Sequence, residues 1–176
     1  MAARAKAAAD GTHAGPVHVN LPFREPLWCA GESLEDFELP AVVSLNHGTQ
    51  NLSAAHLDSL WATMGTSARG VIIAGPRMGS VDVGDRLLAA SVQKLASHLG
   101  WPVIAEPGSG VRTHLNAEDG SVEAADILLR SEAFGQSVAP QLVLRFGKTP
   151  TSKAVRLWAA KWATQTVVIE ENHGWH

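Results

Sequence analysis

The sequence has little of several features that define whole classes of protein. Among 176 residues there is one cysteine, Cys29, which excludes an internal disulfide and a zinc site built from several cysteines. Tyrosine is absent, and the 14 Lys and Arg residues, set against 17 Asp and Glu, form no basic run. A nucleic-acid surface therefore has no electrostatic footprint, and we expect no nucleic-acid partner.

Long apolar runs are absent too. The N-terminal stretch MAARAKAAAD carries Arg and Lys but lacks the apolar core of roughly 7 to 15 residues that a signal peptide needs. No stretch approaches the roughly 20 apolar residues of a membrane span. With 45% hydrophobic residues the chain can still bury one good core. The sequence thus predicts a cytoplasmic protein without an integral membrane segment.

Several catalytic signatures are also missing. The dinucleotide fingerprint G-x-G-x-x-G does not occur, since GPRMGS spaces its glycines four apart and GSGVRT has Thr113 in place of the third glycine. We interpret these glycines as shaping turns. There is no G-x-S-x-G elbow and no Cys-His nucleophile pattern, and the eight histidines lack close ligand spacing. These absences give no support for a dinucleotide site or for covalent catalysis, and we expect no metal ligand in this chain.

What the sequence does contain, from Ser53 onward, is a regular alternation of strand and helix patterns. Apolar runs predict strands, and segments with apolar residues three and four apart predict helices. The strands are expected at 70–75, 102–107, 142–147 and 166–172, and the helices at 53–65, 82–99, 121–134 and 151–163. Because parallel strands need helical crossovers, this order predicts an α/β fold with a doubly wound, mostly parallel, Rossmann-like sheet covered by helices on both faces.

The first 52 residues are less regular. Residues 3–10, ARAKAAAD, have high helix propensity, and VHVN at 17–20 is typical of a short strand. The stretch that follows Trp28 has no sustained period and resembles a linker, with a weak strand candidate at 42–45.

One turn suggests a binding site. In RFGKTPTSKAVRLW the chain leaves a predicted strand, Thr151 or Ser152 can cap the next helix, and Lys153 lies in its first turn. Backbone N–H groups at a helix start, a hydroxyl and an ammonium group together suit a carboxylate or phosphate. An ordinary capped helix with a solvated lysine fits the same spacing, so both interpretations stay open.

Five stretches of the sequence occur together, namely GPVHVNLPFREPL, RGVIIAGPRM, WPVIAEPGSGVR, LRFGKTPTSKAVRLW and VVIEENHGW. Together they resemble the MenD family, the 2-succinyl-5-enolpyruvyl-6-hydroxy-3-cyclohexene-1-carboxylate synthases of menaquinone biosynthesis. The resemblance implies that residues 1–27 are the tail of a pyrimidine-binding domain, 28–40 a linker and 41–176 a central Rossmann-like domain. The family's activating glutamate and its G-D-G motif have no counterpart here, so we expect a fragment that is inactive alone and binds no cofactor.

The resemblance also implies a transferase. It would use thiamine diphosphate and Mg²⁺ to decarboxylate 2-oxoglutarate and add the succinic semialdehyde unit to isochorismate, as a homodimer or homotetramer. Within the chain it implies a structural and substrate-anion-binding role. The substrate-binding candidates are Lys153, Thr151, Ser152 and Arg112. Ala154 stands where some members carry Arg, which leaves Arg156 or Arg112 to supply a second cation.

Two alternatives remain open at this point. One is a stand-alone nucleotide- or FAD-binding Rossmann-like module, because related central domains hold FAD. The other is an allosteric effector-binding domain. Candidate pocket residues for such an effector are Arg69, Arg77, Arg112 and Arg145.

Overall fold

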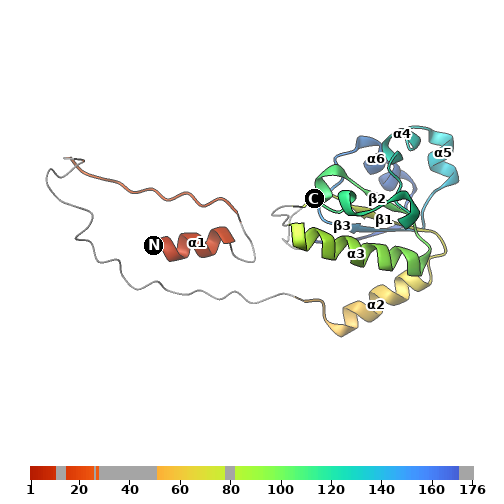
Figure 1. Ribbon diagram of the computed structural model, residues 1–176, viewed down its shortest axis with the longest axis horizontal. Helices are drawn as coiled ribbons and strands as arrows, with labels where there is room; N and C mark the ends of the chain where they lie inside the picture. The colour runs from red at the N-terminus through yellow and green to blue at the C-terminus, as the bar shows by residue number, and fades with distance from the viewer. Residues whose placement is uncertain (11–14, 26, 28–50, 78–81, 171–176) are drawn as a thin grey trace. The chain divides into compact units, whose positions relative to one another are not determined.

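The computed structural model describes residues 1–10, 15–25, 27, 51–77 and 82–170, and the chain divides into two units, Met1–Asn51 and Leu52–His176 (Figure 1). In the first unit, helix α1 spans Ala2–Asp10, as its Ala-rich sequence predicts. The strand expected at 17–20 is wrong: residues 15–20 belong to no strand, since no described neighbour pairs with them. The expected linker at 28–40 and strand at 42–45 lie outside the described residues.

The second unit contains a four-stranded sheet in the order β2-β1-β3-β4. Its strands are β1 Gly70–Ala74, β2 Val103–Ala105, β3 Leu142–Phe146 and β4 Gln165–Ile169. Every pairing is parallel, with Ile72 opposite both Val103 and Leu144. β1 is buried along its whole length, which explains its unbroken apolar sequence. The predicted parallel α/β sheet is confirmed.

Helices cover both faces of this sheet (Figure 1). One face carries α2 Ala54–Gly65 and α3 Asp82–Leu99, and the other carries α4 Ala125–Leu128, α5 Glu132–Ser137 and α6 Lys153–Trp162. Two apolar layers result: Ile72 packs with Val92 of α3, whereas Val71 packs with Trp158 of α6. None of the helices in the described ranges is long and apolar enough to cross a membrane.

The connection from β2 to β3 differs from the expected single helix at 121–134. Three 3-10 turns, η2 Pro107–Ser109, η3 Arg112–His114 and η4 Ala117–Asp119, are followed by the short helices α4 and α5. Ser121 forms a parallel bridge with Val103, and the amide of Val122 donates to the carbonyl of Val103 at 2.8 Å. The prediction was wrong because this backbone adds to the sheet edge before the helix can begin, and Ser131 then caps a new helix.

The carboxyl ends of β1 and β3 are joined by direct backbone contacts. The strand order reverses between these two strands, which is where doubly wound sheets form a ligand crevice. Here the amide of Lys148 donates to the carbonyl of Pro76 at 2.9 Å. A Cβ atom at Gly75 would lie 2.0 Å from the carbonyl oxygen of Lys148. Gly75 therefore lets two backbones meet, which supports its interpretation as a turn residue.

Candidate functional site

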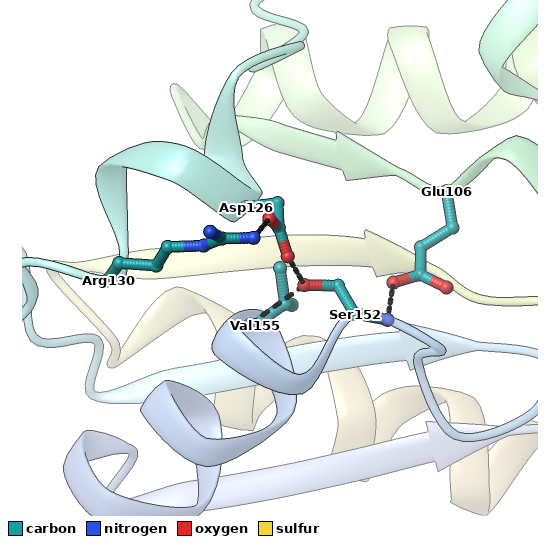
Figure 2. Close-up of polar contacts among 5 residues, drawn as sticks. All are labelled: Glu106, Asp126, Arg130, Ser152 and Val155. Atoms are coloured by element: carbon teal, nitrogen blue, oxygen red, sulfur yellow. Dashed lines mark hydrogen bonds and ion pairs between the residues drawn. The ribbon is translucent and has the colours of Figure 1, made fainter.

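A buried carboxylate lies at the start of helix α6. Glu106 directly follows β2 and is 3% exposed. Its Oε2 accepts hydrogen bonds from the backbone amide and the hydroxyl of Thr151, both at 2.6 Å. Its Oε1 accepts from the amide of Ser152 at 2.9 Å (Figure 2). The two amides that lead into α6 are therefore occupied by a negative group of the chain itself.

A second carboxylate holds the capping serine. Ser152 donates its hydroxyl to Oδ1 of Asp126 at 2.5 Å and accepts from the amide of Val155 at 3.2 Å, as the N-cap of α6 (Figure 2). Arg130 donates to Oδ2 of Asp126 at 2.6 Å. The hydrogen bond from Ser152, and then the one from Arg130, lower the pKa of Asp126. The sequence-predicted residues Thr151 and Ser152 are thus tied to two acids.

Lys153 follows these residues and is exposed. It lines a groove of about 410 Å³ between α6 and the α4–α5 segment, together with the apolar side chains of Leu129, Leu157 and Trp162. This groove also contains two ion pairs, one between Arg130 and Asp126 and one between Lys161 and Glu132. Lys153 forms no ion pair within the described ranges.

The backbone amides at the start of α6 are the second feature of this site. In the part of the chain that the structure describes, the amides of Lys153 and Ala154 have no hydrogen-bond acceptor, whereas the amide of Val155 is capped. The open end of α6 therefore offers two N–H groups beside one ammonium group, which is a suitable arrangement for a carboxylate.

Arg112 does not join this group of residues. Its guanidinium donates to the carbonyls of Ala105 and Glu123, each at 3.4 Å, and the side chain is half-buried. It links the end of β2 to the segment before α4. No contact among the described residues connects it to Thr151, Ser152 or Lys153.

The other arginines considered for an effector pocket serve separate parts of the fold. Arg77 pairs with Asp85 at 3.3 Å, and both side chains are largely buried. Arg145 donates to the hydroxyl of Thr149 at 3.4 Å, but its buried Nε has no partner among the described residues. Burial lowers the pKa of Arg145, against the opposing charge of Glu170. These side chains do not form one cluster of cations through the contacts that the structure shows.

Sequence reasoning missed Glu106 and Asp126. The signal for Glu106 was available, because an acidic residue directly follows the apolar run of β2, at the strand end where ligands or loops meet. Asp126 carried no such signal, since its place in α4 depends on where the chain turns after the bridge at Ser121. Within the described residues no group of three or more His, Cys, Asp or Glu side chains could hold a metal ion.

Comparison with known proteins places the chain in a family. Residues 44–174 match the family model described as "Middle domain of thiamine pyrophosphate". The 2-succinyl-5-enolpyruvyl-6-hydroxy-3-cyclohexene-1-carboxylate synthase of Chloroflexus aurantiacus is 37% identical over 98% of this chain, and that of Geobacillus thermodenitrificans is 32% identical over 99%. The synthase of Halobacterium salinarum is 33% identical over 98%.

The matched region is a limited part of those relatives. The chain covers 29%, 29% and 31% of the Chloroflexus, Geobacillus and Halobacterium proteins, respectively. The resemblance that the five sequence motifs indicated is confirmed, and so is the Rossmann-like fold class. The chain belongs to the middle-domain family of thiamine pyrophosphate enzymes.

Proposed function

We propose that this chain is the middle domain of a synthase that decarboxylates 2-oxoglutarate and adds the resulting succinic semialdehyde unit to isochorismate. The observation that carries the proposal is the match of nearly the whole chain to 2-succinyl-5-enolpyruvyl-6-hydroxy-3-cyclohexene-1-carboxylate synthases, with 37% identity to the Chloroflexus protein. The product for which these synthases are named carries a carboxylate, a succinyl group and an enolpyruvyl group, and is therefore a polyanion. An enzyme for such a compound needs cationic groups at its substrate site.

Lys153 is the cation that we assign to a substrate carboxylate. It is exposed, it lies beyond the carboxyl end of β3, and it has no ion pair within the described residues. The open amides of Lys153 and Ala154 lie at the same helix start. Thr151 and Ser152 contribute by forming the turn, because their own polar groups are bound to Glu106 and Asp126. Arg112 would need to release two carbonyls to bind substrate, so we rank it below Lys153.

Thiamine diphosphate and Mg²⁺ belong to this proposal through the family. The described residues provide no metal-binding cluster, and the backbones after β1 and β3 meet directly at the strand ends. We therefore assign cofactor binding to other parts of the synthase and derive no step through the cofactor here. The match to synthases over nearly the whole chain favours this proposal over a stand-alone nucleotide- or FAD-binding module.

The test is to express the complete reading frame that contains this chain and to incubate the protein with 2-oxoglutarate, isochorismate, thiamine diphosphate and Mg²⁺. We expect CO₂ and the succinylated product in equal amounts. The 176-residue chain alone should form no product and should show no heat of thiamine diphosphate binding in calorimetry. A complete protein that consumes neither substrate would refute the proposed activity, and saturable cofactor binding by the chain alone would refute the assignment of the domains.

A further inference from the structure

On the basis of the proposed function, we propose that Glu106 is a positioning residue that sets the place of Lys153 for a substrate carboxylate. Glu106 itself is buried, so it acts through the turn that precedes Lys153. The hydrogen bonds between Glu106 and this turn connect two separate strand ends, since Glu106 follows β2 and the turn follows β3.

Glu106 is fixed at both its backbone and its side chain. Its amide donates to the carbonyl of Ala74 at 3.0 Å, and its carbonyl accepts from the hydroxyl of Ser109 at 2.6 Å. Three further hydrogen bonds join its carboxylate to Thr151 and Ser152. Because β1 lies between β2 and β3 in the sheet, this side chain bridges over the end of the central strand. The turn is therefore held to a rigid, buried anchor.

The position of Lys153 follows from these bonds. The preceding residue, Ser152, is held at its amide by Glu106 and at its hydroxyl by Asp126, and the same hydroxyl caps α6. Fixing the residue before Lys153 reduces the backbone freedom that substrate binding would otherwise have to remove. The long lysine side chain stays exposed above the groove, and its ammonium group is left for the ligand.

The charge of Glu106 also directs the substrate. An external carboxylate cannot use the amides of Thr151 and Ser152, because Glu106 already occupies them. What remains for it is Lys153, with the open amides at the helix start. Glu106 would thus contribute to specificity, because it occupies the amides of Thr151 and Ser152 and leaves the donors at Lys153 for the substrate.

The test compares four forms of the complete synthase: wild type, Glu106→Gln, Lys153→Met and the double variant. Glutamine keeps the shape of Glu106 but places an NH₂ group or a weaker acceptor against the two amides. We expect Glu106→Gln to raise KM at least fivefold for the same substrate whose KM Lys153→Met raises, with kcat changed less than twofold. In the Lys153→Met background the Glu106→Gln substitution should have no further effect on KM, because Glu106 acts on the substrate only through the side chain of Lys153.

Val92→Ala is the matched control for loss of stability. Val92 is 1% exposed in α3 on the opposite face of the sheet, so the change leaves a core cavity away from the turn and the groove. We expect it to lower the melting temperature without a substrate-specific change in KM. If Glu106→Gln does not fold, Thr151→Val replaces it, since that change removes only the hydroxyl bond to Glu106.

Two results would overturn the positioning role: an unchanged KM in Glu106→Gln, or KM effects of Glu106→Gln and Lys153→Met that multiply in the double variant. Either would make Glu106 a purely structural residue. Failure of the proposed function is separate, because wild-type synthase without turnover would reveal it before any variant is compared. In that case, faster hydrogen exchange at the amides of Thr151 and Ser152 in the Glu106→Gln chain would still show that Glu106 fixes this turn, although its role in substrate binding would be refuted.

Discussion

Oε1 of Glu106 lies 2.9 Å from the backbone nitrogen of Ser152, although 46 positions separate the two residues. The carboxylate at the end of one strand therefore completes the turn that begins a helix after another strand. This contact joins the outer strand β2 to helix α6, and it explains why a buried acid is tolerated in an apolar part of the molecule.

Removing this anchor should destabilise the chain. We expect Glu106→Ala to lower the free energy of unfolding by about 1–3 kcal/mol, because the donors of Thr151 and Ser152 lose their acceptor. Urea denaturation of the 176-residue chain measures this change in the free energy of unfolding. The control is Glu132→Ala, which removes an exposed acid from α5 and should leave the free energy of unfolding nearly unchanged. Equal stability of the two variants would contradict the prediction.

Lys153→Met should affect function far more than stability. In the complete synthase we expect kcat/KM to fall at least tenfold, about 1.4 kcal/mol, because a charge-assisted hydrogen bond to a carboxylate is lost. In the 176-residue chain the same change should alter the free energy of unfolding by less than about 0.5 kcal/mol, since the side chain is exposed. Lys94→Met, an exposed lysine of α3 on the opposite face, serves as the kinetic control. Unchanged kinetics in Lys153→Met would place the substrate elsewhere.

Two glycines should respond to alanine in opposite directions. Gly75→Ala should cost several kcal/mol, on the order of a severe overpacking mutation, because its Cβ would lie 2.0 Å from a backbone oxygen that cannot swing away. Gly84 in α3 has no atom within 4 Å of an added Cβ, so Gly84→Ala should stabilise the chain by about 0.5–1 kcal/mol. Thermal unfolding of both variants tests the pair. A mild effect at Gly75 would mean that the loops after β1 and β3 can separate.

The pH dependence of stability should reveal Asp126. Its pKa in the folded chain lies below 3.8, because Ser152 and Arg130 favour the charged carboxylate. The unfolded chain therefore takes up the proton first as the pH falls, and the contribution of Asp126 to stability, fully present above pH 3.8, is lost below it. Melting temperatures of wild type and Asp126→Asn should differ near neutral pH and converge as the pH falls below 3.8. A difference in melting temperature that grows on acidification would contradict the lowered pKa of Asp126.

The sequence was sufficient for the elements whose pattern is local. The apolar run of β1 and the spacing of α3 predicted a parallel sheet with helices, and Ser152 was correctly one of two expected caps of α6. The segment after β2 could not be predicted in the same way. Ser121 pairs with the sheet edge and Ser131 starts a second helix, and neither event leaves a helical or alternating pattern in the sequence.

The candidate site was only half accessible from the sequence. Lys153 at a helix start could be found by spacing, but the groups around it come from elsewhere in the chain. Glu106 reaches the turn across the strand order, and Asp126 does so from α4. Such contacts depend on which strands become neighbours, and that order is a property of the whole sheet.

The central place of β1 has a consequence for how the protein is made. Among the described strands β1 is the first to leave the ribosome, yet Gly70 pairs with Leu142, so one of its edges stays bare until most of the second unit has been synthesised. Closing so long a loop is slow compared with forming a helix, and refolding should be limited by this pairing. Incomplete translation products that end before Leu142 would expose a five-residue, entirely apolar strand, and such products should aggregate.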